Sequence, residues 1–187
     1  DAVGHKHASL VGHSQGCLVA MECASRYPDK IKTLSLMGGA GAIPMNPELL
    51  LLAENSDPKA VDLMMDFAHG PSGHFGGHPV PGLYHLNTGS MLVQSKEIKD
   101  TLGVDFRACE NYTNGFDAAK KLNLPTLSIL ADKDRMCRLK DGQKLANHIT
   151  GSEVHIIKNC GHMMLLEEAD QTLSILKKFI IEKYPNT

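Results

Sequence analysis

Short apolar runs and longer helix-like stretches alternate in the first part of the chain. Residues 7–11 (HASLV) and 32–37 (KTLSLM) have the length and composition of short buried strands. Residues 16–24 between them are rich in small apolar side chains and predict a helix. This helix should close at Tyr27-Pro28, because the residue before a proline disfavours helical geometry. The pattern therefore predicts strand, helix and strand in sequence.

The same alternation returns in the last third of the chain. Residues 125–131 (PTLSILA) and 153–157 (EVHII) predict two further strands. An amphipathic helix is expected around 139–149, and a closing helix from about 168 to 183. Strands that alternate with helices indicate a parallel sheet with helices on both faces. We therefore expect an α/β fold with a parallel sheet of about four strands.

The middle of the chain has a different character, with helical and irregular stretches and without clear strands. Asp57-Pro58 starts one helix well, because a capping side chain is followed by proline at the first helical position. That helix should stop near Gly70. Residues 70–82 hold five glycines and three prolines and predict a loop.

We expect two more helices in this middle segment, around 88–97 and 104–121. The whole segment, residues 44–121, is too long for a structureless loop inside a compact domain. We therefore expect an inserted helical cap there, between core segments at 1–43 and 122–187.

Composition excludes several classes of function. The formal net charge of −2 gives no electrostatic case for nucleic acid binding. No apolar run approaches the roughly 20 residues that span a bilayer, so no membrane partner is expected. There is no secretory signal at the start. The five cysteines contain no Cys-x-x-Cys pair, which argues against a disulfide framework or structural zinc and favours a cytoplasmic location.

Five residues at the first predicted turn carry the strongest chemical signal. Gly12-His13-Ser14-Gln15-Gly16 fits the Gly-x-Ser-x-Gly pattern of a nucleophile elbow, in which a serine lies on a tight turn between a strand and a helix. We expect glycine at both flanks because a larger residue would collide with the crowded backbone. The predicted strand and helix supply the context that the motif requires. The alternative is a surface turn that glycines happen to bracket.

A nucleophilic serine needs a base, and the base needs a third group that orients it. In this architecture both belong on loops at the carboxyl ends of later strands. The third strand is followed by Ala-Asp-Lys-Asp-Arg and the fourth by Asn-Cys-Gly-His-Met-Met. The first loop offers Asp132 or Asp134, of which the spacing favours Asp134, and the second offers His162, preceded by glycine. The order Ser, Asp, His along the chain suits this fold.

These motifs together resemble the carboxyl-terminal portion of an α/β-hydrolase of the capped esterase, C–C hydrolase and cofactor-free haloperoxidase group. Residues 125–134 resemble the strand that carries the acid in that group, which usually ends Gly-x-x-Asp. Asp134 falls on the acid position, and Ala131 replaces the usual glycine. Gly161-His162 resembles the loop that carries the histidine of that group. The resemblance covers most of the chain and is weak through the predicted cap.

The resemblance implies a role for each of these residues. Ser14 would be the nucleophile, His162 the general base and then acid, and Asp134 the orienting carboxylate. The backbone N–H of Gln15 would be one oxyanion donor, and no cofactor is implied. The four predicted strands would be the fifth to eighth of the family. We therefore expect a chain truncated at its N-terminus, with the second oxyanion donor outside it.

Other side chains are candidates for the substrate pocket or for a metal. The pocket candidates are His13, Phe75 and Met163. His69, His74 and His78 cluster around Phe75, but their glycine-rich spacing fixes no geometry and offers no acidic or cysteine partner. We therefore expect no metal and interpret this loop as lining the substrate entrance.

The function expected from these observations is a serine hydrolase that acts on a carboxylic ester or a related small acyl compound. Fold analogy does not separate this activity from C–C bond hydrolysis, thioester cleavage or perhydrolysis. An inactive fragment, or a ligand receptor that retains the triad, are the alternatives from other classes. The first strand would form a bare apolar edge of the sheet, so we expect self-association through it.

Overall fold

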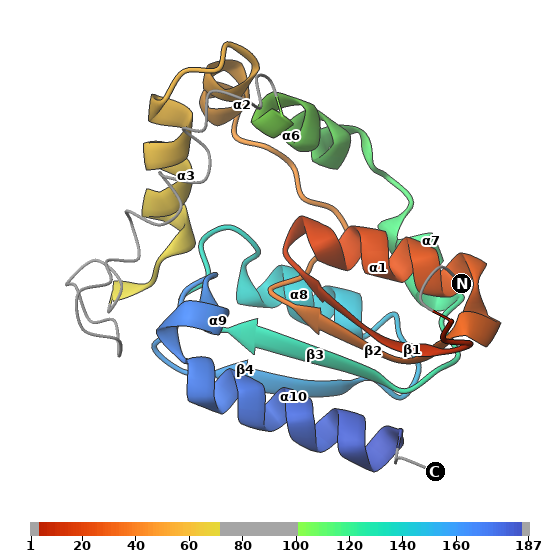
Figure 1. Cartoon of the computed structure of the whole chain (residues 1–187). Coiled ribbons are helices and arrows are strands. Elements are labelled where there is room, and N and C mark those ends of the chain that lie inside the picture. Colours follow the sequence, from red (N-terminus) through yellow and green to blue (C-terminus); the bar gives the residue numbers. More distant parts are fainter. Residues whose placement is uncertain (1–3, 72–100, 185–187) are drawn as a thin grey trace.

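A four-stranded parallel sheet lies at the centre of the molecule (Figure 1). The computed structural model describes residues 4–71 and 101–184. The strands are β1 (Ala8–His13), β2 (Ile31–Met37), β3 (Thr126–Ala131) and β4 (Glu153–Ile157), and they lie side by side in that order. All three pairings are parallel. The predicted fold class and all four predicted strands are confirmed.

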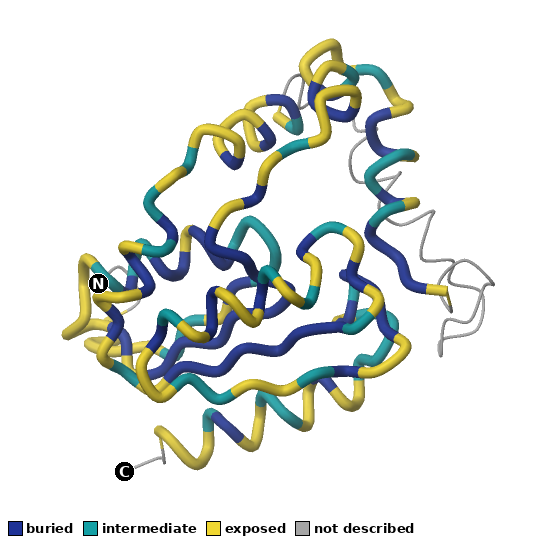
Figure 2. The backbone as a smooth tube through the Cα atoms, turned by 180° about the vertical axis from the view of Figure 1, so that it is seen from behind, coloured by how far each residue is buried: buried dark blue, intermediate teal, exposed yellow. Residues whose placement is uncertain are grey.

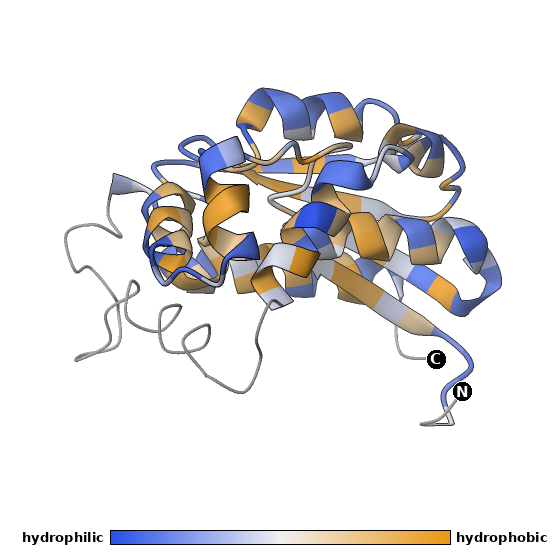
Figure 3. Cartoon of the chain, turned by 90° about the horizontal axis from the view of Figure 1, so that it is seen from above, coloured by the Kyte–Doolittle hydropathy of each residue, from blue (hydrophilic) through white to orange (hydrophobic). Residues whose placement is uncertain are grey.

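Helices cover both faces of this sheet, as the alternation of strands and helices predicted (Figure 1). On one face lie α1 (Gln15–Arg26), α7 (Gly115–Lys120) and α8 (Leu139–Ala146), and on the other lies α10 (Ala169–Lys183). The helices seen in Figure 3 carry both apolar and hydrophilic positions, so one side of each can be buried. The short α9 (Met164–Glu167), which the sequence did not predict, precedes α10.

Two apolar clusters hold the helices to the sheet. Leu34 and Leu36 of β2 pack with α1, whereas Met37 belongs to the opposite cluster, in which Ile129 of β3 and Phe179 of α10 also lie. Successive side chains of a strand point to opposite faces, so one strand contributes to both clusters. The middle strands are buried throughout most of their length, and the outer side of α10 is exposed (Figure 2).

Three further helices lie above the α1 side of the sheet (Figure 1): α2 (Pro47–Glu54), α3 (Lys59–Ala68) and α6 (Thr101–Asn111). They share an apolar cluster that includes Leu49 and Phe106. The helix predicted to start at Asp57-Pro58 is α3, which begins one residue later than expected, at Lys59, and Asp57 Oδ1 accepts the Lys59 N–H at 2.9 Å. We did not predict α2, although Asn46-Pro47 is the same kind of start.

The connection back to the sheet contains two helices where the sequence predicted one. The prediction of a continuous helix at 104–121 is wrong, because α6 ends at Asn111 and α7 begins at Gly115. Gly115 lies so close to Gly41 that a Cβ on it would collide with the Gly41 carbonyl. The break therefore lets the incoming and outgoing connections run close together. The α7 helix lies inside the predicted cap range, yet it packs against α1.

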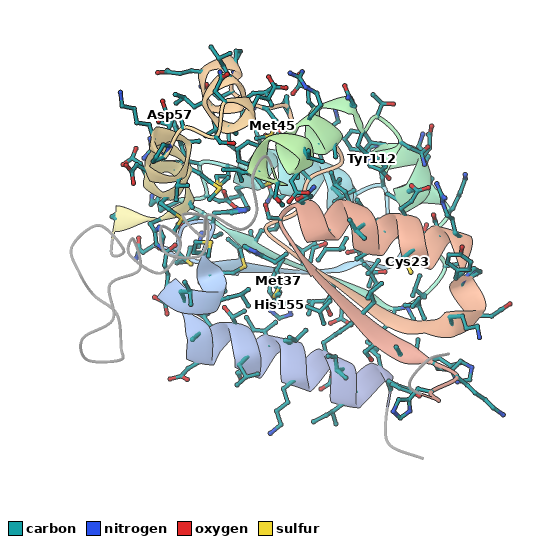
Figure 4. The ribbon with its side chains drawn as sticks, turned by 45° about the horizontal axis from the view of Figure 1, so that its top comes forward. Cys23, Met37, Met45, Asp57, Tyr112 and His155 are labelled. Carbon is teal, nitrogen blue, oxygen red and sulfur yellow. The ribbon has the colours of Figure 1, made fainter. Side chains whose placement is uncertain are left out.

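Hydrogen bonds join these connections to α1. Tyr112, which lies above α1 in Figure 4, donates its hydroxyl to Glu22 Oε2 at 2.7 Å, and Asn114 Nδ2 donates to the same oxygen at 3.0 Å. The Met45 N–H donates to Glu110 Oε2 at 2.6 Å and joins the two connections to each other.

The helix predicted at 88–97 lies outside the described residues. No helix in the described ranges has the length and apolarity needed to cross a membrane.

Candidate active site

The turn between β1 and α1 holds Ser14 in an unusual backbone conformation. Its φ is 55° and its ψ is −125°, a region that non-glycine residues rarely occupy and that costs about 1–3 kcal/mol. The Ser14 N–H donates to Met37 O at 3.0 Å, which fixes the turn against the end of β2. Ser14 is also the N-cap of α1, yet its side chain makes no capping hydrogen bond. Its hydroxyl is therefore not engaged by the helix it precedes.

The flanking glycines differ in what they do. A Cβ on Gly12 would lie 2.7 Å from the carbonyl carbon of Gly16 and 2.8 Å from Cys17 N, so a side chain there would disrupt the turn. The expected collision is thus confirmed for Gly12. For Gly16 the expectation is wrong within the described part of the chain, because nothing outside the adjacent backbone of its own helix lies within 4 Å of its Cβ position.

His162 and Asp134 form a buried pair at the carboxyl ends of β4 and β3. His162 Nδ1 lies 2.7 Å from Asp134 Oδ2, and both side chains are almost completely inaccessible. The second carboxylate oxygen of Asp134 accepts the N–H groups of Met136 at 2.9 Å and Cys137 at 2.8 Å. These hydrogen bonds fix the carboxylate, which in turn orients the imidazole ring.

The protonation pattern of His162 follows from this partner. An ionised carboxylate only accepts hydrogen bonds, so Nδ1 carries the proton and a neutral ring presents a lone pair at Nε2. His162 Nε2 is buried and has no hydrogen-bond partner among the described residues, Ser14 included. Hydrogen bonds between a nucleophile and its base often tighten only when substrate is bound. The arrangement suits a general base.

Asp132, the alternative acid, does not contact His162 through any hydrogen bond in the described ranges. Its N–H donates to Ile157 O at 3.1 Å and continues the pairing of β3 with β4. Of the two carboxylates, the structure places Asp134 against the histidine.

The histidine loop also lies directly against the elbow. The His13 Nε2–H donates to His162 O at 2.9 Å, and the centroids of the two rings are 4.8 Å apart. Burial lowers the pKa of His13, and the nearby His162 lowers this pKa further. The neutral form is therefore favoured. His13, expected in the substrate pocket, supports the backbone of His162 in the structure.

Gly38 contacts the same pair from the end of β2, a role that the sequence did not reveal. Its φ is 57°, and a Cβ on it would lie 3.1 Å from both Nδ1 and Cε1 of His162. The same Cβ would lie 3.4 Å from Asp134 Oδ2. The Gly-Gly sequence after a buried strand was the available signal, but it does not say which groups need the space.

The remaining candidates occupy different places. Gln15 opens α1, and the first N–H groups of a helix have no partner within it. Its side chain donates to Asp105 O of α6 at 3.2 Å. Met163 is half-buried, and its N–H donates to Ala68 O at 3.2 Å. Phe75, His74 and His78 lie outside the described residues. His69 is buried, and its Nδ1–H donates to Met65 O at 3.0 Å. Within the described ranges, no three metal-binding side chains are grouped to hold an ion.

Comparison with known proteins identifies the family to which this chain belongs. The family model described as "Alpha/beta hydrolase family" matches residues 1–175, from the start of the chain into α10. The chain belongs to the alpha/beta hydrolase family. The resemblance found in the elbow and in the acid and histidine loops is therefore confirmed at the level of the superfamily.

Three relatives within this broad superfamily illustrate its range. A 2-hydroxy-6-oxononadienedioate/2-hydroxy-6-oxononatrienedioate hydrolase from a Pseudomonas species is 25% identical over 190 residues, which cover 96% of this chain and 65% of that protein. The solved structure of a thermophilic esterase is 27% identical, with a TM-score of 0.78 over 95% of this chain and 67% of that one. The enol-lactonase of Burkholderia xenovorans is 20% identical and shares the fold, with a TM-score of 0.81 over 94% and 66%.

Proposed function

We propose that this alpha/beta hydrolase chain carries the nucleophile, base and acid of a serine hydrolase that cleaves a carboxylic ester. The observation that supports this most strongly is the buried hydrogen bond between His162 and Asp134, which lies directly against the turn that carries Ser14. The 27% identity to a thermophilic esterase is consistent with the same chemistry. The chain spans 65% of the length of its Pseudomonas relative, so the proposal concerns the residues present here.

The proposed acylation step begins when Ser14 Oγ attacks the carbonyl carbon of the ester and His162 Nε2 takes the hydroxyl proton. The Nδ1–H of His162 stays hydrogen-bonded to Asp134, whose negative charge stabilises the imidazolium that forms. The tetrahedral intermediate collapses, the C–O bond to the alcohol breaks, and His162 returns the proton to the leaving oxygen. The acyl group remains on Ser14 as an ester.

Deacylation repeats the same steps with water. His162 removes a proton from a water molecule, which attacks the acyl carbon, and the proton then returns to Ser14 Oγ as the carboxylic acid leaves. In both steps the Gln15 N–H would donate to the developing oxyanion. Gln15 lies at the positive end of the α1 dipole, which favours negative charge at that position.

Hydrolysis of a C–C bond is the second candidate within the enzymes. It is favoured by the match to a 2-hydroxy-6-oxononadienedioate/2-hydroxy-6-oxononatrienedioate hydrolase over 96% of this chain. A substrate of that kind would also meet Ser14 and His162, so the two candidates differ in the bond that breaks rather than in the residues used.

Pre-steady-state kinetics with p-nitrophenyl acetate test the proposal. We expect a burst of p-nitrophenol, stoichiometric with the chain and followed by turnover, that Ser14→Ala abolishes. Ser25→Ala removes a hydroxyl that bonds to Glu22 O within α1 and serves as the matched control with an intact burst. A burst without turnover favours the receptor alternative, and a burst that survives Ser14→Ala excludes Ser14 as the nucleophile. An absent burst favours an inactive fragment.

A further inference from the structure

The end of helix α3 is attached to the loop that carries His162. Both the His162 N–H and the Met163 N–H donate to the carbonyl of Ala68, the last residue of α3, at 2.8 and 3.2 Å. Figure 1 shows α3 descending toward α9 at this end of the sheet. The backbone of the candidate base is thus bonded to a helix that lies about a hundred residues earlier in the chain.

A single carboxylate joins the two segments a second time. Glu167, at the end of α9, accepts the Gly70 N–H at 2.9 Å and the Gly161 N–H at 3.0 Å, both through Oε2. Gly161 immediately precedes His162, and Gly70 lies two residues beyond the end of α3. The carboxylate therefore bridges the chain just after α3 and the chain just before the histidine.

The two glycines allow this bridge to form. A Cβ on Gly70 would lie 2.6 Å from Gly161 N and 2.7 Å from Glu167 Oε2. A Cβ on Gly161 would lie 2.8 Å from Glu167 Oε1 and would also strike the Gly70 backbone. Any side chain at either position would therefore separate the two backbones and displace the carboxylate.

We propose that Glu167 is a positioning residue for His162, an inference that rests on the proposed function. Asp134 orients the ring of His162, whereas Glu167 and Ala68 constrain its backbone. Hydrogen bonds to an ionised acceptor are stronger than neutral ones. A catalytic group displaced by about 1 Å can lose on the order of 100-fold in rate. Loss of the bridge should therefore slow the reaction of Ser14.

The bridge has a second consequence, because the same carboxylate holds the chain that follows α3. The position of α3 and the position of His162 are coupled through Glu167 and Ala68. Gly70→Ala, which leaves Glu167 in place, should therefore also slow the reaction of Ser14, although Gly70 makes no described contact with that serine.

The test measures the rate at which diethyl p-nitrophenyl phosphate inactivates the full chain between pH 5.5 and 9, with Ser14→Ala as the blank. We expect Glu167→Ala to react about tenfold more slowly or worse across this pH range. Glu167→Gln should stay within about threefold of the parent chain, because one amide oxygen can accept both N–H bonds. The matched control is Glu182→Ala, which removes an exposed glutamate paired with Lys178 at 3.9 Å, and it should react normally.

Proton NMR of the His162 Cε1–H provides the same comparison without reaction at Ser14. We expect its chemical shift at a fixed pH to change in Glu167→Ala, because the ring moves relative to Asp134, and to return to the parent value in Glu167→Gln. An identical Cε1–H chemical shift in all three chains, or a Glu167→Gln variant as slow as Glu167→Ala, would overturn the positioning role. A parent chain that shows no Ser14-dependent inactivation contradicts the proposed function instead, and the NMR comparison then decides the role of Glu167 alone.

Discussion

The carboxylate of Asp134 determines which nitrogen of His162 carries a proton, so its removal tests the chemistry at the scale of one atom. Asparagine has nearly the same shape but can present an N–H to the ring, which would place the lone pair on Nδ1. We therefore expect Asp134→Asn to slow acylation by p-nitrophenyl acetate by about 10⁴-fold. Asp132→Asn is the matched control and should stay within about threefold. Equal losses of the acylation rate in Asp134→Asn and Asp132→Asn would contradict the assignment of Asp134.

A substitution at Gly38 tests how tightly the chain packs around the buried pair of His162 and Asp134. Gly38→Ala adds a methyl group 3.1 Å from the His162 ring at a φ of 57°, so we expect both slower acylation and a loss of about 1–3 kcal/mol in the free energy of unfolding. Gly151→Ala is the control, since its φ is 71° but its Cβ would meet nothing within 4 Å. It should lose stability by about 1–2 kcal/mol with acylation unchanged. Urea denaturation and burst kinetics measure the two effects.

The sequence sufficed for some site residues and not for others. Ser14, Asp134 and His162 could be named because each follows a strand whose apolar pattern is clear. Gly38 and Glu167 could not, because Gly38 meets His162, and Glu167 meets Gly70, only in the folded chain. A lone glutamate five residues after a histidine carries no local pattern that predicts two backbone N–H donors.

At the scale of elements, Glu22 of α1 holds the connection between α6 and α7. Hydrogen bonds from Tyr112, Asn114 and Arg26, in that order of importance, lower the pKa of Glu22 to about 2 from 4.5. A carboxyl group whose pKa is lowered on folding stabilises the fold above its unfolded pKa. Its contribution is therefore complete above about pH 4.5 and disappears as the pH falls toward about 2.

Removal of the Tyr112 hydroxyl tests this link between α1 and the segment that joins α6 to α7. We expect Tyr112→Phe to lose about 1.5–3 kcal/mol in the free energy of unfolding at pH 7, because a hydrogen bond to a charged group is lost. The difference from the parent chain should narrow as the pH falls below about 4.5. Tyr27→Phe changes a side chain that is 59% exposed and should have little effect. A difference that stays constant down to pH 2.5 would contradict this account.

Elements were predictable where the local pattern and the tertiary environment agree. β3 is buried along its whole length, and its apolar run is the clearest in the chain. The short α9 and the break between α6 and α7 were missed, because both depend on close contacts with distant segments. The break in the predicted helix lies where Gly115 closely approaches the backbone of Gly41, a contact that no helical periodicity reveals.

At the scale of the whole molecule, β1 pairs with β2 alone among the described strands and forms an edge of the sheet. Val11 in this strand is 39% exposed, and exposed apolar edges favour association. Self-association through this edge stays a prediction. We expect the parent chain to elute as an oligomer in size-exclusion chromatography with light scattering, and Val11→Lys to elute as a smaller species.

The matched control for that experiment is Val104→Lys, which adds the same charge at a position of α6 that is 65% exposed. It should leave the oligomer intact, because Val104 lies on a helix rather than on the sheet edge. A monomeric parent chain, or dissociation by Val104→Lys as well, would show that the edge of β1 does not direct association.

The central claim is that the buried Asp134–His162 pair activates Ser14, and the site of covalent modification tests it most directly. The full chain is treated with diethyl p-nitrophenyl phosphate, digested, and mapped by mass spectrometry. We predict one diethylphosphate on the peptide that contains Ser14, and its loss in both Ser14→Ala and His162→Ala. Modification of another residue, or undiminished modification of Ser14 in His162→Ala, would contradict the account.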